Sequence, residues 1–345
     1  MAGNGNLQMS RAGKTDEFYT QLSTIEQELN HYRAYFRDKI VFCNCDDPYE
    51  SNFFKYFVIH FQEFGLKKLI ATCYAASQVA YTQFPVPDVG EENRAEKKSY
   101  KIVITQVGQV TPPDTAPSDV AALLKNPNNQ LSLLEGDGDF RSQECLELLE
   151  ECDLVATNPP FSLMKEYIPL LIQRGKQFII LGNLNHITFR EVKPFVLEGS
   201  MWLGYHSGHF WFRVPSNYEA KGTDYKQDAD GQKWRRMGNS CWFTNVDIPK
   251  RHVPLTLEAV YSPQRYPKYD DYDAIECGKY REIPADYGGV IGVPITYLPY
   301  HCPEQFEILA LVTPKIDGKS KYKRLLIRRR PENGGAEHGQ PAEVP

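Results

Sequence analysis

The chain has 345 residues, of which 41% are hydrophobic, 24% charged and 12% aromatic, and its formal net charge is −5. These values are typical of a soluble globular protein of about two domains and exclude a disordered or low-complexity chain. The apolar runs, such as 178–181, are far shorter than the roughly 18 residues that cross a bilayer, and residues 1–14 lack the apolar core of a secretory signal. We therefore expect a cytoplasmic protein without a membrane role.

The eight cysteines predict reduced thiols, because disulfides are rare in proteins without a secretory signal. Cys43 and Cys45 are the one closely spaced pair, and this spacing puts both side chains on the same face of a strand. No second pair of Cys or His accompanies them in the sequence to complete a zinc site. We expect buried thiols and no metal site.

From Lys39 to Val214 short apolar runs alternate with helical patterns, which is typical of βαβ units around a mainly parallel sheet. The aromatic residues of 51–64 recur at helical spacing and form one apolar stripe. The predicted helices are 51–64, 142–149 and 163–172. The predicted strands are 40–45, 69–74, 131–134, 154–158, 178–181 and 201–205, with 210–214 as the antiparallel partner of the last.

The alternation of predicted strands and helices is interrupted at two places. Residues 76–130 are rich in loop formers and predict an insertion with an extra strand at 101–107. After residue 215 the sequence is rich in Tyr, Pro and Gly, and the alternation of strands and helices ends. The predicted parts are a disordered N-terminus (1–14), an α/β domain (15–215), a second domain (216–330) and a disordered tail (331–345).

The most informative motif is an apolar strand that runs directly into Asn158-Pro159-Pro160-Phe161. Two prolines cannot continue a strand, so the chain must turn at the strand's carboxyl end, where open α/β sheets bind ligands. The side-chain oxygen of Asn158 and the carbonyl of Pro159 can accept both hydrogen bonds of one planar amino group, and Phe161 offers a ring on which a base can stack. An ordinary strand-to-helix turn is the alternative interpretation.

The motif resembles that of amino-group DNA methyltransferases dependent on S-adenosylmethionine. Further strings are similar to the EcoRI-type adenine-specific (N6) modification methylases, and they lie at 16–20, 43–48, 52–56, 136–141, 266–270, 272–275 and 292–296. The resemblance implies a Rossmann-like S-adenosylmethionine-dependent methyltransferase sheet with a C-terminal target-recognition domain. It also implies a catalytic domain at 15–215 and a site-specific DNA methyltransferase that flips its target adenine.

The resemblance places the cofactor, S-adenosyl-L-methionine, over the carboxyl ends of the first three strands. The Asp139 carboxylate would accept the adenine amino group of the cofactor, and the Phe140 ring would pack against its base. Phe18, Tyr19 and Thr20 resemble the segment that closes over the methionine moiety, although the first two also suit an apolar anchor for the next helix. The other expected cofactor-binding residues are Asn44, Asp46, Pro48, Cys73 and Tyr74.

Two features of this expected site differ from the usual pattern. The Gly-rich loop after the first strand is replaced by 44–48, which leaves open whether Asn44, Asp46 or Asp47 contacts the cofactor. His186 lies near the site in sequence, but we expect it to start a local helix. The cationic product of amine methylation is strongly acidic, so the reaction needs no positioned base.

The order of the motifs indicates where DNA binds. Little room for a recognition domain precedes Asn158, so we expect that domain at 216–330. Its last segment, 315–330, carries eight basic residues against one acidic residue, which favours phosphate contacts, although a solvated tail is the alternative. The expected DNA-binding residues are Lys233, Arg235, Arg236, Lys321, Lys323, Arg324, Arg328, Arg329 and Arg330.

The predicted function is therefore adenine-N6 methylation of double-stranded DNA, with Asn158, Pro159, Pro160 and Phe161 as the catalytic residues. A cognate restriction endonuclease is an expected member of the same system, without direct contact. An RNA or protein-glutamine methyltransferase that uses the same Asn-Pro-Pro-aromatic turn is the alternative enzyme. A catalytically silent nucleic-acid-binding module is the alternative from another class.

Overall fold

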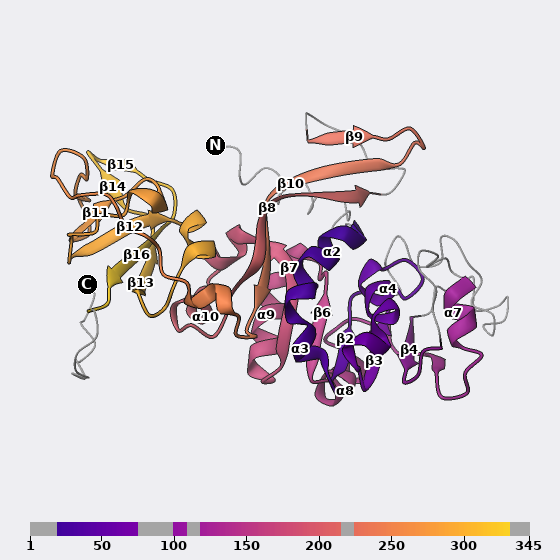
Figure 1. The fold of residues 1–345 in the computed structure, drawn as a ribbon. Helices are drawn as coiled ribbons and strands as arrows, with labels where there is room; N and C mark the ends of the chain where they lie inside the picture. Colours follow the sequence, from indigo (N-terminus) through magenta and orange to yellow (C-terminus); the bar gives the residue numbers. More distant parts are fainter. Residues whose placement is uncertain (1–18, 75–98, 109–117, 215–223, 332–345) are drawn as a thin grey trace. The chain divides into compact units, whose positions relative to one another are not determined.

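The computed structural model describes residues 19–74, 99–108, 118–214 and 224–331. The chain divides into two units, Met1–Val246 and Asp247–Pro345. In Figure 1 the first unit runs from indigo to salmon and the second from orange to yellow. The terminal segments predicted to be disordered lie outside the described residues, apart from Pro331.

A mixed sheet of ten described strands forms the centre of the first unit, in the order β1-β8-β10-β7-β6-β2-β3-β4-β5, with β9 paired to β10. The central strands β7, β6, β2 and β3 run parallel, and the strands outside them pair antiparallel. The α/β class is therefore confirmed. The strands are β1 (Tyr19–Thr20), β2 (Ile40–Cys43), β3 (Lys68–Thr72), β4 (Tyr100–Ile104), β5 (Gln130–Leu133), β6 (Leu154–Thr157), β7 (Gln177–Asn183), β8 (Trp202–Val214), β9 (Tyr225–Gln227) and β10 (Lys233–Thr244).

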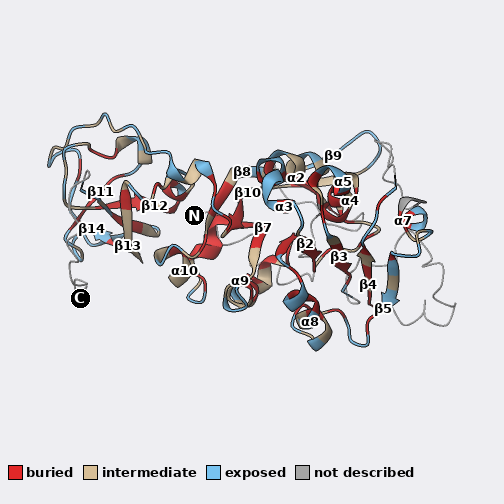
Figure 2. Cartoon of the chain, turned by 60° about the horizontal axis from the view of Figure 1, so that its bottom comes forward, coloured by how far each residue is buried: buried red, intermediate tan, exposed pale blue. Residues whose placement is uncertain are grey.

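The parallel strands are buried on both faces. Every residue of β2 and β6 is buried, as expected for strands covered by helices on either side. Figure 2 shows α2, α4 and α5 on one face of this sheet and α8 and α9 on the other. The helices of the first unit are α2 (Leu22–Leu29), α3 (Arg33–Phe36), α4 (Asn52–Ile59), α5 (Phe61–Phe64), α7 (Ser118–Leu123), α8 (Gln143–Glu151), α9 (Met164–Gln173) and α10 (Lys193–Leu197), with 3-10 turns η1 (Asn30–Tyr32), η2 (Phe161–Leu163) and η3 (Leu184–Thr188).

The predicted helices are confirmed, and local sequence explains where they start. The Ser51 hydroxyl accepts the backbone N–H of Phe53 at the start of α4, and the Ser142 hydroxyl accepts that of Cys145 at the start of α8. The predicted helix 51–64 is interrupted at His60, so that α4 and α5 follow each other.

One predicted hairpin is wrong. The predicted strands 201–205 and 210–214 do not pair with each other, because residues 202–214 form the single strand β8, which passes through Gly208 at φ +137°. Their antiparallel partner is β10, which comes later in the chain. The polar residues 206–209 resemble a turn in the sequence, but the backbone groups of this part of β8 pair with a strand that no local pattern identifies.

The boundary between the units also differs from the predicted one at 215. β10 lies between β7 and β8 and pairs with both, so it belongs to the sheet of the first unit. Four of its last residues, Cys241 to Thr244, are fully buried there. The first unit consequently extends to Val246.

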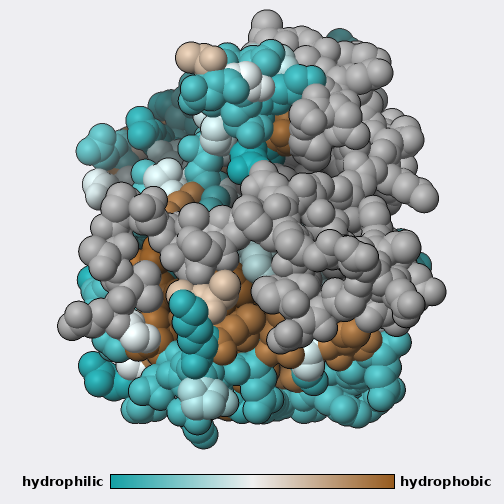
Figure 3. Space-filling view, turned by 90° about the vertical axis from the view of Figure 1, so that its right-hand side faces the viewer, coloured by the Kyte–Doolittle hydropathy of each residue, from teal (hydrophilic) through white to brown (hydrophobic). Residues whose placement is uncertain are grey.

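The edge of the sheet at β5 is exposed. Leu133 on β5 is 39% exposed and Tyr74, after β3, is 38% exposed. From the side of the first unit that carries α7, hydrophobic residues gather between hydrophilic ones in the lower half of the face (Figure 3).

The second unit contains a four-stranded sheet in the order β11-β12-β16-β13 and a hairpin of β14 and β15. The basic segment predicted as phosphate-binding is therefore not a tail, because β16 lies in the middle of the sheet and buries Leu325, Leu326 and Ile327. The elements are β11 (Ala274–Glu276), β12 (Val290–Pro294), β13 (Phe306–Val312), β14 (Lys315–Ile316), β15 (Lys319–Ser320), β16 (Arg324–Arg329), η4 (Pro249–His252), η5 (Tyr280–Glu282) and η6 (Ile295–Tyr300).

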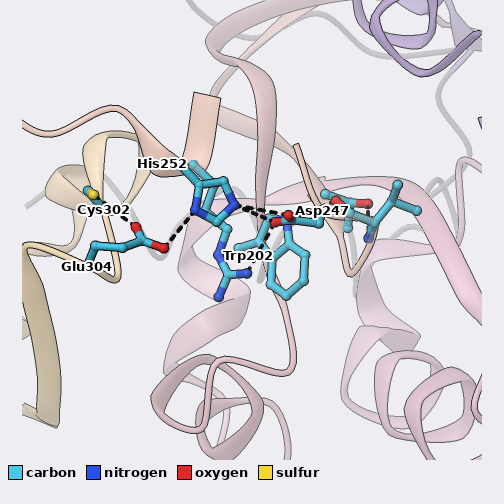
Figure 4. Close-up of polar contacts among 8 residues, drawn as sticks. Trp202, Asp247, His252, Cys302 and Glu304 are labelled. Atoms are coloured by element: carbon cyan, nitrogen blue, oxygen red, sulfur yellow. Dashed lines mark hydrogen bonds and ion pairs between the residues drawn. The ribbon is translucent and has the colours of Figure 1, made fainter. Parts of the chain in front are cut away.

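Polar contacts fix the first residues of the second unit. His252 bridges Asp247 (2.9 Å from Nε2) and Glu304 (2.8 Å from Nδ1), and the Cys302 thiol donates to Glu304 (Figure 4). The hydrogen bonds to Asp247 and Glu304 raise the pKa of His252. His252 thus links two segments of this unit.

All eight cysteines are free thiols, and seven of them are buried. In the described ranges no group of His, Cys, Asp or Glu is arranged to hold a metal ion. None of the helices in those ranges has both the length and the hydropathy of a membrane span.

Candidate active site

The Asn-Pro-Pro-Phe turn lies at the carboxyl end of β6, between β2 and β7 in the sheet. Pro160 precedes η2 with an extended ψ of 122°, and α9 follows directly. The side-chain oxygen of Asn158 is buried. The turn thus occupies the sheet edge at which open α/β proteins bind their ligands.

Asp46, in the loop after β2, is bound to this turn. It is 6% exposed, and its carboxylate accepts hydrogen bonds from the Ser51 hydroxyl (2.6 Å), the Thr157 hydroxyl and the backbone N–H of Asn158. Burial raises the pKa of Asp46 to about 6, although these hydrogen bonds lower it. Both carboxylate oxygens therefore bind the protein itself, and a cofactor contact by Asp46 would be additional to these three hydrogen bonds.

Asn44 and Phe140 meet at Tyr167 on α9. The Tyr167 hydroxyl donates to Asn44 Oδ1, and its ring meets the Phe140 ring edge-on, with centroids 5.0 Å apart. Asn44 Nδ2 is buried and has no hydrogen-bond partner in the described part of the chain. The predicted cofactor residues Asn44 and Phe140 are thus brought together, and Asn44 keeps a donor for a ligand.

A close contact also joins the loop after β5 to the end of β3. Gly138 has φ +77°, and a Cβ at this position would lie 2.3 Å from the carbonyl oxygen of Cys73, so only glycine fits. Ser99 supports the same loop by donating to the Gly136 carbonyl (2.6 Å). The ends of β3 and β5 therefore meet, as predicted, with Cys73 buried and Tyr74 at the surface.

Asp139 is held by an arginine. Arg141 donates to both carboxylate oxygens, from Nε to Oδ1 (2.8 Å) and from Nη2 to Oδ2 (2.6 Å), and it also pairs with Glu166 (2.6 Å). The hydrogen bonds from Arg141 lower the pKa of Asp139. A cofactor amine would have to share this carboxylate with a bidentate guanidinium.

Asp47 remains a candidate for a cofactor contact. One of its oxygens accepts from the Tyr100 hydroxyl (2.8 Å) and from the backbone N–H of Tyr49 (2.9 Å). Burial raises the pKa of Asp47 to about 6, although the hydrogen bond from Tyr100 lowers it. Pro48, the next residue, is buried.

The described part of the N-terminal segment forms a short strand. Tyr19 and Thr20 form β1 at the edge of the sheet beside β8, while Phe18 lies outside the described residues. Asn52 donates to the Thr20 carbonyl (2.7 Å), which fixes β1 at the start of α4. Thr20 Oγ1 is buried without a hydrogen-bond partner among the described residues.

Phe161 packs against His186. Its ring is only 2% exposed and meets the imidazole edge-on, with centroids 5.3 Å apart. His186 lies in the first turn of η3, as expected for a residue at a helix start, and its Nδ1 accepts the backbone N–H of Asn183, whose side chain caps the same turn. Burial lowers the pKa of His186 to about 3, so its imidazole is neutral and a very weak base.

Five site residues were not identified from the sequence: Ser51, Tyr49, Tyr100, Thr157 and Tyr167. Tyr100, Thr157 and Tyr167 act through partners far away along the chain, whereas Ser51 and Tyr49 bind Asp46 and Asp47 within the same loop. Of these five, only Thr157 could have been identified from the sequence, because a buried hydroxyl directly before Asn158 needs a hydrogen-bond partner.

The predicted DNA-binding residues of β10 belong to the first unit, not to the second domain. Lys233 and Arg235 lie where β10 pairs with both β8 and β9. Arg236 pairs with Asp224 (2.8 Å) and lies over the Trp211 ring. Lys226 of β9 also lies over Trp211, 4.5 Å from its centroid.

The basic residues of β16 differ in their surroundings. Arg324 pairs with Glu276 (2.7 Å), and the two side chains are 13% and 11% exposed. A phosphate contact by Arg324 would leave Glu276 without its cation, so the structure does not support this prediction. Arg328 pairs with Glu307, Arg329 donates to the Ala285 carbonyl and Arg330 to that of Pro303.

The sequence matches the family model described as "Adenine-specific methyltransferase EcoRI" over residues 6–341. It is 42% identical over 339 residues to Type II methyltransferase M.EcoRI of Escherichia coli, with 95% of this chain and 98% of that protein aligned. It is 30% identical to M.MpnI of Mycoplasma pneumoniae and 29% identical to M.MgeORF184P of Mycoplasma genitalium, with 93% of this chain and 97% of each relative aligned. No solved structure matches.

The large mixed sheet, with Asn158–Phe161 at the carboxyl end of a central strand, agrees with this match over nearly the whole chain. The chain therefore belongs to the EcoRI family of adenine-specific methyltransferases.

Proposed function

We propose that this site-specific DNA adenine methyltransferase flips its target adenine out of the duplex and methylates the N6 atom within the Asn158–Phe161 turn. The position of that turn at the carboxyl end of β6, bound to Asp46, is the observation that carries the proposal. Asn158 Oδ1 and the Pro159 carbonyl accept the two N–H groups of the exocyclic amine and direct its lone pair outward. S-adenosylmethionine supplies the electrophilic methyl group. Neutral His186 takes no proton, because the methylated amine is acidic enough to lose one to water.

Base flipping is part of the proposal because a paired adenine cannot present its amine to Asn158. Extrusion costs a few kcal/mol, and stacking on an aromatic ring, worth about 1–3 kcal/mol, offsets part of that. The Phe161 ring is 2% exposed, so the groups that cover it must move before a base can stack on it. Binding of the base and a local rearrangement around Phe161 are therefore coupled.

The buried polar groups near the turn fit S-adenosylmethionine. Asn44 Nδ2 and Thr20 Oγ1 lack partners within the described ranges, and a buried polar group without a partner costs about 1–3 kcal/mol. A ligand with amino, carboxylate and hydroxyl groups would satisfy them. We assign the binding of this cofactor to Thr20, Asn44, Asp47, Pro48, Cys73, Tyr74, Asp139 and Phe140.

We assign DNA contacts to basic residues of both units. The second unit is the proposed target-recognition domain, and Lys321, Lys323, Arg328 and Arg330 are among the partly or fully exposed cations of residues 315–330. In the first unit, Lys233 and Arg236 accompany Trp211 on the paired strands β8 and β10. Such residues bind phosphates and position the duplex without reading its sequence. We further propose that this methylation protects DNA from a cognate Type II endonuclease and that it takes place in the cytoplasm.

Transfer of tritium from labelled S-adenosylmethionine tests the substrate class. The purified chain is offered duplex DNA, RNA and a glutamine-containing protein in one reaction, and each is then separated and counted. The proposal expects the label in DNA alone. Label in RNA or protein would support the alternative enzyme, and no label anywhere would indicate the catalytically silent module.

A further inference from the structure

Asp46 connects two loops that are far apart in the sequence. The loop after β2 carries the expected cofactor residues, and the turn after β6 carries Asn158. The Asp46 carboxylate binds the hydroxyl of Thr157 and the backbone N–H of Asn158, while Ser51 at the start of α4 donates to its other oxygen. One side chain therefore joins β2, β6 and α4 at the point where the turn begins.

The bond to Asn158 acts on the peptide that carries the catalytic amide. A hydrogen bond to the backbone N–H fixes the orientation of that peptide plane. The rings of Pro159 and Pro160 fix their own φ angles, so the backbone after Asn158 has little conformational freedom. The positions of the Asn158 side chain and of the Pro159 carbonyl consequently depend on Asp46. Thr157, directly before Asn158, is held by the same carboxylate, so the turn is anchored at two successive residues.

This carboxylate is costly to bury. Asp46 has no cation partner among the described residues, and its three donors are two hydroxyls and one peptide N–H. Replacing it by a neutral side chain of the same shape would remove the desolvation penalty of the charge. A group kept for stability alone would not need that charge.

We propose that Asp46 is a positioning residue for methyl transfer, whose carboxylate sets the geometry of the Asn158 turn rather than binding the cofactor. The inference rests on the proposed function of that turn. It assigns to Asp46 an effect on the rate of the chemical step and only a minor effect on substrate affinity, because the residue acts on the acceptor geometry for the reacting amine.

The test compares Asp46→Asn with Asp153→Asn, a matched control in the same strand pair. The Asp153 carboxylate accepts the backbone N–H of Ile40 (2.8 Å) and joins β2 and β6 before β6 begins, at the end away from the turn. Single-turnover methylation rates, KM for DNA and for S-adenosylmethionine, and melting temperatures are measured for both variants and for the wild type.

We expect the single-turnover rate of Asp46→Asn to fall about 100-fold, the effect of a misplacement of roughly 1 Å at a reacting group. Both KM values should stay within about threefold, and the melting temperature at pH 7.5 should be unchanged or higher. Asp153→Asn should keep the wild-type rate. A rate within threefold of wild type for Asp46→Asn, or an equal loss in both variants, would overturn the proposal.

The pH dependence provides a second measurement that folding defects do not imitate. Below about pH 6 Asp46 becomes protonated, so the wild-type rate should fall on the acidic side. The ionisable groups around it are Asp47, Cys43, Cys45 and Tyr167; burial raises the pKa of each, and of these only Asp47 titrates near the same pH. The fall of the rate below about pH 6 is the acidic limb of the pH–rate profile. The Asp47→Asn variant should keep this limb and the Asp46→Asn variant should lose it. The opposite result would assign the limb to Asp47.

Thr157→Val keeps the proposal testable if Asp46→Asn does not fold. This variant removes one hydrogen bond to the charged carboxylate, which should move the acidic limb to higher pH. An unmoved limb would contradict the proposal. Failure of the proposed function is a separate result, since wild-type enzyme would then not methylate adenine N6 at any pH.

Discussion

At the scale of single residues, Asn158 carries the most direct prediction. Asn158→Ala should lower the single-turnover rate at least 100-fold, because the amide oxygen orients the amine mainly in the transition state. DNA affinity, measured by fluorescence anisotropy, should stay within about threefold of wild type. Asn128→Ala, at an exposed asparagine outside the site, is the control. A variant with wild-type turnover would remove Asn158 from the reaction.

Phe161 has a packing role in addition to its expected stacking role. Because the ring is buried against His186, Phe161→Ala would open a cavity and destabilise the fold by about 3–5 kcal/mol, and Phe161→Trp would overpack the same space. Phe161→Leu retains most of the volume but lacks the π-face. We expect it to melt near the wild type while a 2-aminopurine at the target position shows that the flipped base is held less well. Unchanged fluorescence would place the base elsewhere.

The sequence predicted the turn at Asn158 after a buried strand but not the residues that support it. Asn158 to Phe161 are adjacent in the chain, so a local sequence motif is sufficient to predict the turn that they form. Asp46 and Asn44 were expected at the cofactor, but their partners are Thr157 and Tyr167, more than one hundred residues away. These groups meet only because β2 pairs with β6, and the spacing of residues in the sequence does not predict that pairing.

At the scale of elements, the central position of β16 separates two kinds of basic residue. Lys321, Lys323, Arg328 and Arg330 are proposed phosphate ligands, and neutralising all four should reduce the slope of log affinity against log salt by about 0.9 for each phosphate that the protein no longer binds. Arg324→Met should leave that slope unchanged and destabilise the second unit by about 3 kcal/mol, because Glu276 would remain buried without its cation. Filter binding at several salt concentrations and denaturant unfolding distinguish the two results. An unchanged slope in the quadruple variant would exclude this segment from DNA binding.

Strands were predicted well where burial gives them a continuous apolar run. The runs that became β2, β3, β5, β6 and β7 were found from sequence, as was the extra strand β4. β8 was divided in two because His206 to His209 are polar, yet this part of the strand pairs with β10 instead of turning. Long antiparallel strands that extend beyond the core lack the apolar pattern on which strand prediction depends.

At the scale of the whole molecule, Asp46 and Asp47 predict how stability changes with pH. Burial raises both pKa values from an ordinary 3.8 to about 6, so each carboxyl stabilises the fold most when it is protonated, below pH 4. That contribution is lost as the pH rises through about 6. The free energy of unfolding of Asp46→Asn, relative to wild type, should therefore increase between pH 4 and 6 and stay constant above. Urea denaturation at four pH values measures this difference, and a difference independent of pH would mean that Asp46 has an ordinary pKa.

The division of the chain into units was the least predictable feature. The sequence changes composition at 215, where the alternation of strands and helices ends, but the first unit continues to Val246. β10 (Lys233–Thr244), which follows this change in composition, inserts between β7 and β8. The amino-acid composition indicates which segments form regular βα units. The boundary between the two units depends instead on where β10 pairs.

The identity of the methylated base shows whether the Asn158 turn methylates adenine N6. Duplex DNA is incubated with the wild type or with Asn158→Ala and S-adenosylmethionine, digested to nucleosides and analysed by mass spectrometry. We predict N6-methyladenine as the one new nucleoside with the wild type and its loss with Asn158→Ala. N4-methylcytosine or 5-methylcytosine in its place, or equal N6-methyladenine from the variant, would contradict it.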